Sequence, residues 1–155
     1  THPPDRTSSG PFAPGSILSG GAGPPRHNTP QPGADMGNHY QQASLGSRLG
    51  IPTIYGIDAV HGNNNVAGAT IFPQNVGMGA TNDPALVTQE CAATALEMNA
   101  VGIRWSFGTV IAVPQDIRWG RTFEGFSENT VRASKLGTDS LKAFQGSHLA
   151  RDNPT

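Results

Sequence analysis

The protein has 155 residues, a length typical of one domain, with 35% hydrophobic and 14% charged residues. Its 10 basic and 11 acidic side chains give a formal net charge of -1, so it lacks the basic surplus of nucleic-acid-binding proteins. The single cysteine, Cys91, excludes an intrachain disulfide, and no apolar run reaches the roughly 18 residues that a membrane span needs. We therefore expect neither nucleic acid nor a membrane as a partner.

Glycine and proline dominate the first part of the chain. Eight of the 13 prolines lie before residue 33, which predicts a loop-rich segment over residues 1–33, with one short strand candidate at Ser16–Ser19. Residues 34–155 then form the predicted folded domain. Its first element is a helix over Asp35–Leu49, in which apolar residues recur at near-helical spacing and Gly50 can end the helix.

The rest of the chain alternates between short β-rich runs and helical patterns. The predicted elements are a strand at Ile51–Ile57, a polar loop at Asp58–Asn82, a helix opened by Asp83-Pro84 and ended by Gly102, a strand at Ile103–Val113, a loop at Pro114–Phe126, and a helix capped by Ser127 and ended by Gly146. The buried sides of the two helices are predicted to be Val87, Cys91, Ala95 and Met98 in the first, and Val131, Leu136, Leu141 and Phe144 in the second.

This order of elements predicts the α/β fold class, with a parallel sheet and right-handed crossovers. The loops that follow the strands are long, whereas the links from helix to strand are short. In parallel α/β folds, binding sites form at the carboxyl ends of the strands. The two loops at 58–82 and 114–126 are therefore the segments in which a site is expected.

The first loop begins with an acid, Asp58, directly at a strand end, followed by His61 and the three asparagines 63–65. A carboxylate at a strand end can accept hydrogen bonds from neighbouring sugar hydroxyls, and asparagine amides both donate and accept. A structural interpretation is equally open: Asp58 caps a turn, and the asparagines hold the loop in left-handed conformations.

The second loop holds two arginines on either side of Trp119. A guanidinium group offers a planar fork of donors that suits vicinal hydroxyls or a carboxylate. Glu124 could orient Arg121, and Asp116 could orient Arg118. Trp119 could stack on a sugar face. The structural alternative is a salt-bridged loop in which the tryptophan belongs to the core.

Other chemical signals are weak. No metal-ligand spacing is present, because His61 stands alone and Cys91 falls in the middle of a predicted helix, where a small core residue is the simplest interpretation. Gly77-Met78-Gly79 resembles part of a dinucleotide-binding fingerprint, but no clear strand precedes it, so we predict a turn. We expect no cofactor and no metal.

Two stretches resemble glycoside hydrolase family 3, the family of plant-type and bacterial exo-β-glucanases and β-glucosidases. One is Gly-Ile-Asp-Ala-Val-His-Gly at 56–62 with Gly-Ala-Thr-Ile-Phe-Pro at 68–73; the other is Asp-Ile-Arg-Trp-Gly-Arg at 116–121 with Glu-Gly-Phe-Ser-Glu at 124–128. They occur in the family's order and spacing, within a resemblance that covers about residues 14–146. The resemblance implies part of a (β/α)8 TIM-type barrel, with about three strand–helix units in this chain.

The resemblance also implies retaining hydrolysis of terminal, non-reducing β-D-glucosyl residues by the parent protein. The positions that match the family's substrate-binding residues are Asp58 and Arg121, with Phe107 lining the neighbouring region. Retaining hydrolysis needs two carboxyl groups about 5 Å apart. In the family both lie later in the protein, so we expect the nucleophile and the acid/base beyond Thr155 and no catalytic residue in this chain.

The resemblance therefore implies a fragment of an O-glycosyl hydrolase that is inactive alone, and the start at Thr1 in place of Met agrees with a processed or partial chain. Its expected partners are a β-glucoside or β-glucan oligosaccharide and the rest of the parent chain. The resemblance implies an extracellular or cell-wall location. The alternatives are a non-catalytic sugar-binding or interaction module with the same fold and a purely structural α/β domain.

Overall fold

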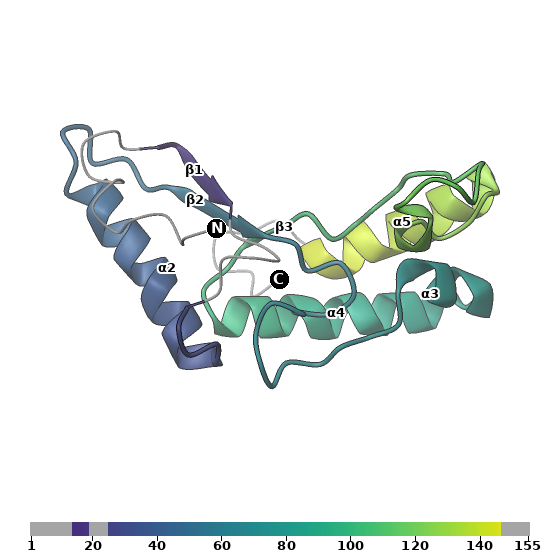
Figure 1. Ribbon diagram of the computed structural model, residues 1–155, viewed down its shortest axis with the longest axis horizontal. Helices are drawn as coiled ribbons and strands as arrows, with labels where there is room; N and C mark the ends of the chain where they lie inside the picture. The colour runs from purple at the N-terminus through teal and green to yellow at the C-terminus, as the bar shows by residue number, and fades with distance from the viewer. Residues whose placement is uncertain (1–13, 19–24, 147–155) are drawn as a thin grey trace.

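A computed structural model describes residues 14–18 and 25–146 of the chain. Three strands, four α-helices and one 3-10 turn follow one another in these residues (Figure 1). In chain order they are β1 (Ser16–Leu18), α2 (Pro30–Leu45), β2 (Ile54–Ile57), α3 (Asn75–Thr81), α4 (Pro84–Ala100), β3 (Trp105–Ser106), η1 (Thr122–Glu124) and α5 (Thr130–Gln145). None of the helices in this part of the chain is long and apolar enough to cross a membrane.

The strands form one parallel sheet in the order β1-β2-β3. Gly56 lies at the centre, because it pairs with Leu18 on one side and with Trp105 on the other. The α/β class and the parallel sheet predicted from the sequence are confirmed, with three strand–helix units in the described residues. The division of the chain at residue 33 remains a prediction, and both β1 and the first residues of α2 lie before it.

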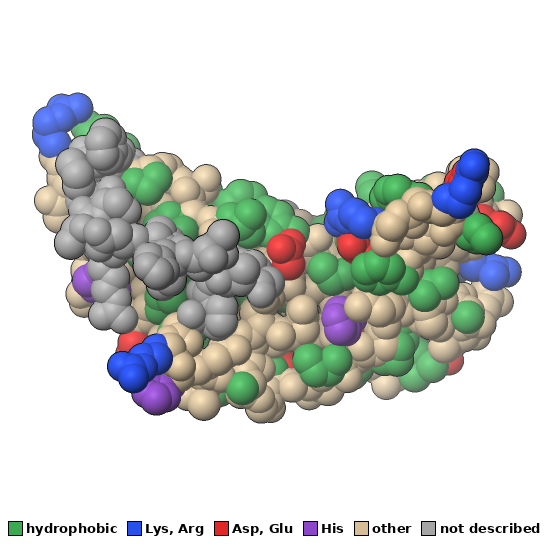
Figure 2. Space-filling model, in the orientation of Figure 1, with side chains coloured by type: hydrophobic (Ala, Val, Ile, Leu, Met, Phe, Trp, Pro, Cys, Tyr) green, Lys and Arg blue, Asp and Glu red, His purple; other side chains and the backbone are tan. Residues whose placement is uncertain are grey.

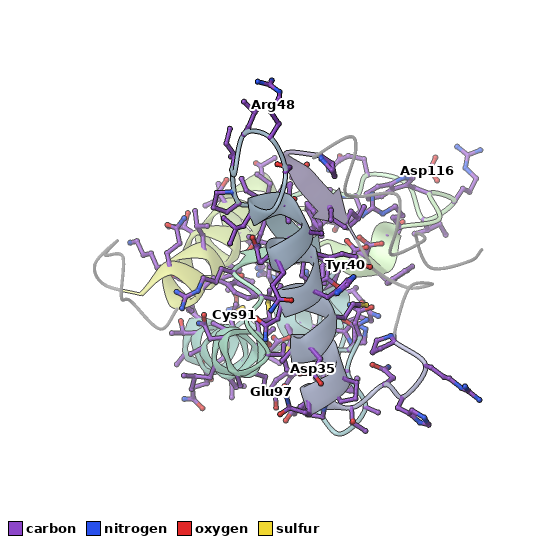
Figure 3. All side chains as sticks on the ribbon, turned by 90° about the vertical axis from the view of Figure 1, so that its left-hand side faces the viewer. Asp35, Tyr40, Arg48, Cys91, Glu97 and Asp116 are labelled. Carbon is purple, nitrogen blue, oxygen red and sulfur yellow. The ribbon has the colours of Figure 1, made fainter. Side chains whose placement is uncertain are left out.

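One face of the sheet is covered by helices. Tyr55 and Ile57 of β2 are buried in a core cluster that also holds Tyr40 of α2 and Met98 of α4. The rings of Tyr40 and Tyr55 meet edge to face, with centroids 5.6 Å apart. Figure 1 shows α2 and α4 below the strands, and Figure 3 looks toward α2 with Tyr40 labelled. Burial of these aromatic and aliphatic side chains fixes the helices on this face.

No helix among the described residues covers the opposite face of the sheet. Leu18 and Ile54 are 61% and 59% exposed there, and Trp105 is 39% exposed. The space-filling view shows hydrophobic side chains along the concave upper side of the molecule (Figure 2). Side chains two residues apart on a strand point to the same face, so this face carries Gly56 and, beyond the strand end, Asp58.

A second core cluster joins α4 to α5. It contains Val87 and Cys91 of α4, Leu136 of α5, Met78 of α3 and Phe126, all buried. The predicted apolar side of α4 is confirmed, because Val87, Cys91, Ala95 and Met98 are all buried. Its predicted start is confirmed too: Asp83 is the N-cap, and Pro84 occupies the first turn.

The buried face of α5 differs from the prediction. Leu136 is 2% exposed as expected and Phe144 packs against both clusters, but Val131 and Leu141 are 76% and 46% exposed. A step of five residues turns a helix by about 140° beyond a full turn, so these side chains cannot share one face. The buried residues of this helix are Ala133, Leu136, Gly137 and Ser140. The N-cap is also different, because Asn129 and not Ser127 accepts the hydrogen bond from the N–H of Arg132.

Several further boundaries differ from the prediction. Helix α2 ends at Leu45 and not at Leu49, and β2 begins at Ile54 and not at Ile51. Helix α2 begins at Pro30, because proline fits the first turn of a helix, where its missing N–H has no partner in any case. Strand β3 spans only Trp105–Ser106, because its neighbour β2 ends at Ile57 and the residues after Phe107 have no strand to pair with. The expected loop after β2 contains α3, so the predicted turn at residues 77–79 is wrong and these residues are helical.

Candidate functional site

Asp58 stands directly after β2, and its side chain is exposed on the face of the sheet opposite to α2 and α4. Its backbone carbonyl is held in place: the side-chain Nδ2 of Asn65 donates to it at 2.8 Å. The Asn64 amide, oriented so that its nitrogen faces acceptors, donates to the same oxygen at 2.8 Å. Two amides thus fix the backbone at Asp58 and leave its carboxylate at the surface.

These bonds bear out part of the structural interpretation of the asparagines, because Asn64 and Asn65 do hold the loop. The left-handed conformations expected of them are absent. Among the described residues, the one non-glycine residue with positive φ is Asn82, at 52°.

Phe107 lies beside Asp58 at the end of the neighbouring strand. Its N–H donates to the carbonyl of Ile57 at 3.0 Å, the last bond between these two strands. The Phe107 ring packs against Trp105, with centroids 4.7 Å apart. Both rings lie over Gly56, where a Cβ atom would come within 2.9 Å of the Phe107 ring. Glycine at 56 therefore lets an aromatic floor form next to the carboxylate.

Arg121 is oriented by Glu124, three residues later. Its Nε donates to Oε1 of Glu124 at 2.9 Å, and a second guanidinium nitrogen donates to Oε2, which makes the pair bidentate. The Glu124 side chain is 13% exposed, whereas that of Arg121 is 64% exposed. The acid is therefore the fixed partner, and the arginine presents its remaining donors to solvent.

Asp58 and Arg121 also act on each other electrostatically. The pKa of Arg121 is raised, first by its hydrogen bond to Glu124 and then by the charge of that carboxylate, and the negative charge of Asp58 raises it further. The structure thus brings Asp58 and Phe107 to adjacent strand ends, and the Asp58 charge acts on Arg121.

The other arginine of the second loop is paired in the way expected. Nε of Arg118 donates to both carboxylate oxygens of Asp116, and this bond is the main cause of the lowered pKa of that acid. Asp116 lies at the periphery of the molecule (Figure 3). Trp119 is 39% exposed and Ile117 is 92% exposed, so this part of the loop does not belong to the core.

The loop after β2 folds back on itself and is tied to α4. Nδ1 of His61 lies 2.8 Å from the carbonyl oxygen of Phe72, which can only accept, so Nδ1 carries the proton in this bond. Gly62 and Ile71 form an isolated bridge between the two arms of the loop. The carboxylate of Glu97 then accepts from the N–H and the hydroxyl of Thr70, the latter at 2.8 Å. His61 is therefore bound to the loop backbone.

Sequence reasoning missed two polar residues that support the site. Glu97 is one of two acids in α4, and only the fold shows that it holds Thr70. Asn75 was assigned to a loop, although it begins α3 and its Nδ2 donates to the carbonyl of Glu124 at 2.8 Å. An asparagine soon after a proline was the sole local signal, and it does not reveal a partner 49 residues away.

No metal site emerges from the described residues, since no group of three or more His, Cys, Asp or Glu side chains lies together there. Glu90 and Cys91 are buried in α4, and burial raises the pKa of Glu90 to about 7 and that of Cys91 to about 11. Cys91 lies inside the molecule (Figure 3), as the sequence suggested. Neither residue belongs to the site at Asp58.

The arrangement of a strand-end carboxylate, an aromatic floor and an oriented arginine can be compared with known proteins. Residues 14–152 match the model of the glycosyl hydrolase family 3 N-terminal domain. The chain belongs to glycosyl hydrolase family 3. The resemblance stated from the two loop motifs is therefore confirmed, and the parallel sheet of the chain is part of this family's TIM-barrel-type domain.

Two curated relatives of this family 3 chain are named as β-glucosidases. The lysosomal beta glucosidase of Dictyostelium discoideum is 38% identical over 141 residues, which are 90% of this chain and 17% of that protein. The periplasmic beta-glucosidase of Salmonella typhimurium is 32% identical over 112 residues, 72% of this chain and 14% of that protein. The chain thus spans less than a fifth of the length of these relatives.

Solved structures agree with this assignment. The exo-1,3/1,4-beta-glucanase from a Pseudoalteromonas species superposes with a TM-score of 0.85 at 35% identity, covering 94% of this chain and 19% of that one. The beta-glucosidase from Listeria innocua in complex with glucose gives a TM-score of 0.68 at 27% identity, covering 86% and 16%. The family 3 fold is therefore shared over nearly the whole chain.

Proposed function

We propose that this chain is the sugar-recognition part of a β-glucosidase-type glycoside hydrolase that removes terminal, non-reducing β-D-glucosyl residues. The observation that carries the proposal is the placement of Asp58 and Phe107 at adjacent strand ends, together with the effect of the Asp58 charge on Arg121, whose guanidinium group is oriented by Glu124. Support also comes from the two relatives described above, which are named as β-glucosidases, and from the exo-1,3/1,4-beta-glucanase with the same fold.

Each of the three side chains has a distinct part in this proposal. The Asp58 carboxylate, an acceptor with two oxygens, takes hydrogen bonds from two neighbouring hydroxyls of the sugar. Arg121 keeps donors free beyond its bidentate bond to Glu124 and gives them to the same sugar. The Phe107 ring, steadied by Trp105, meets the apolar C–H surface of the sugar. Such a site fixes the position of the glucosyl unit.

Retaining hydrolysis is part of the proposal, and it assigns the nucleophile and the acid/base to the rest of the parent protein. None of the acids in the site described above takes these roles, because Asp58 is assigned to sugar hydroxyls and Glu124 is engaged by Arg121 on both oxygens. The parent's place outside the cytoplasm is likewise proposed, on the support of relatives named as lysosomal and periplasmic.

A calorimetric titration of this chain with glucose and laminaribiose tests the recognition part. We expect binding by the wild type, and at least about tenfold weaker binding for Asp58→Asn and Arg121→Lys, because each change removes a charged or bidentate partner of the sugar. Asp116→Asn and Arg118→Lys are matched controls, since they make the same chemical changes in the ion pair at the periphery. Equal losses in all four variants would contradict the proposal.

The proposed hydrolysis is tested on the full-length protein that the parent transcript encodes. The proposal expects hydrolysis of an aryl β-glucoside by that protein and none by the 155-residue chain alone. A transcript that stops after Thr155, together with sugar binding, would instead favour the non-catalytic sugar-binding module. Turnover by the 155-residue chain alone would overturn the assignment of the catalytic pair to the rest of the parent.

A further inference from the structure

Asn75 makes a long-range contact that the proposed sugar site does not explain. It is the first residue of α3, the residue is 2% exposed, and its Nδ2 donates to the backbone carbonyl of Glu124 at 2.8 Å. Glu124 is the last residue of η1, the single turn that follows Arg121. A buried amide thus joins α3 to the turn that carries the partner of the sugar-binding arginine.

Helix α3 is tightly packed against residues 124–126. A Cβ atom on Gly79 would come 1.7 Å from the carbonyl oxygen of Phe126, so the helix backbone touches the chain just beyond η1. On the other side, a Cβ on Gly125 would come 2.7 Å from the ring of Pro114. Segment 124–126 is therefore packed between α3 and the start of the same loop, and the Asn75 bond sets its position along the helix.

Asn75 connects to Arg121 in two steps. It fixes the backbone of Glu124, and the Glu124 carboxylate, 13% exposed, holds the guanidinium group through two hydrogen bonds. We propose that Asn75 is a positioning residue for Arg121, which sets the direction of the arginine's free donors through the backbone and side chain of Glu124. The sugar-binding consequence of this inference rests on the proposed function, whereas its structural part does not.

The alternative is that Asn75 only stabilises α3. Loss of the amide would then lower the stability of the protein and leave the Arg121–Glu124 pair unchanged in the folded state. A readout at Arg121 itself, measured well below the unfolding midpoint, separates the two. The Nε–H group of Arg121 is such a reporter, because its hydrogen bond to Glu124 slows its exchange with water.

The experiment records the arginine Nε–H signals of the 155-residue chain by ¹⁵N NMR, with Arg121→Lys to assign the signal of interest. Asn75→Asp keeps the shape of the side chain and removes its donor. Asn75→Ala replaces it as the test variant if Asn75→Asp does not fold. Glu124→Gln is the positive comparison. Gln115→Ala is the matched control, because Nε2 of Gln115 likewise donates to a backbone carbonyl, that of Glu128 at 2.9 Å, which is not part of η1.

We expect Nε–H exchange at Arg121 to rise at least about tenfold in the Asn75 variants and in Glu124→Gln, and to stay unchanged in Gln115→Ala. A wild-type signal in a folded Asn75 variant would overturn the inference. Glucose affinity is measured on the same samples, and the Asn75 variants should bind at least about tenfold more weakly, because misplaced binding groups lose much of their effect. The two proposals can fail separately. If the wild type binds no glucose, the proposed function is refuted. If exchange at Arg121 is still faster in the Asn75 variants, the positioning role is supported all the same.

Discussion

Gly79 and Phe126 touch through their backbones, although they lie far apart in the chain. A Cβ atom on Gly79 would lie 1.7 Å from the carbonyl oxygen of Phe126 and 2.6 Å from its carbonyl carbon. Gly79 is helical and has no positive φ, so space and not backbone conformation requires glycine here. The close approach lets α3 seat Asn75 against Glu124 and places Met78 in the core cluster with Phe126.

Gly79→Ala is therefore expected to destabilise the protein by about 1–3 kcal/mol, the usual cost of forcing atoms into a filled space. Gly77→Ala is the matched control on the same helix, because its Cβ would meet only Pro73, at 3.4 Å. That change should be neutral or stabilising by up to about 1 kcal/mol, since alanine favours helix. Urea unfolding midpoints measure both changes, and equal stability of the two variants would contradict the packing argument.

Helix α4 begins with a side-chain cap that can be tested alone. Oδ1 of Asp83 accepts from the N–H groups of Ala85 at 2.9 Å and Leu86 at 3.4 Å. Asp83→Ala should lower the free energy of unfolding by about 1 kcal/mol, because two N–H groups lose their partner. Asp83→Asn keeps an acceptor oxygen and should lose much less. An alanine variant as stable as the asparagine variant would show that solvent replaces the cap.

Local signals account for the elements that the sequence predicted correctly. The start of α4 follows from Asp83-Pro84, and its buried side follows from four apolar residues at helical spacing. The position of Asp58 at a strand end follows from the β-rich run before it. Each of these depends on residues within a few positions of one another, where propensity and periodicity act directly.

The features that were missed depend on contacts between distant segments. Gly77 and Gly79 were predicted to form a turn, because nothing near them indicates that Phe126 needs the space beside Gly79. The length of β3 depends on where β2 ends, and the hydrogen bond from Asn75 to Glu124 joins positions 49 apart. The buried face predicted for α5 is wrong for a different reason, because Val131, Leu136 and Leu141 recur at five-residue spacing, which does not keep side chains on one helical face. Tertiary packing, and not local propensity, decides the features that depend on contacts between distant segments.

Cys91 should be nearly unreactive in the folded protein. It is 6% exposed, and burial raises its pKa from 9.0 to about 11, with the charge of Glu90 adding to the rise and the hydrogen bond to Ser140 opposing it. The thiolate is the reactive form, so a rise of that size lowers reactivity near pH 8 about 100-fold relative to the unfolded chain, and burial lowers it further.

Absorbance after addition of a disulfide reagent measures this difference between native and guanidinium-unfolded protein. Ser140→Ala is an informative variant, because it removes the 3.1 Å contact that lowers the thiol pKa and so should not increase native reactivity. Rapid labelling of the native wild type would show that the helix pair α4–α5 opens readily or that Cys91 is accessible.

Glu90 should make stability depend on pH. Its side chain is buried in α4, its Oε2 has no hydrogen-bond partner, and burial raises its pKa from 4.5 to about 7. The folded state thus binds this proton more tightly than the unfolded state does. The resulting stabilisation is fully present below about pH 4.5, falls as pH rises, and is lost above about pH 7, with a total on the order of 3 kcal/mol.

Glu90→Gln removes the titration and keeps the shape of the side chain, so the comparison of the two proteins isolates this one group. Between about pH 5 and pH 8 the wild type should lose more stability than the variant, and at about pH 8 the variant should be the more stable protein, because it avoids a buried charge. Guanidinium unfolding across this pH range measures both curves. Parallel curves would mean that water reaches the Glu90 carboxylate and that it ionises near its ordinary pKa.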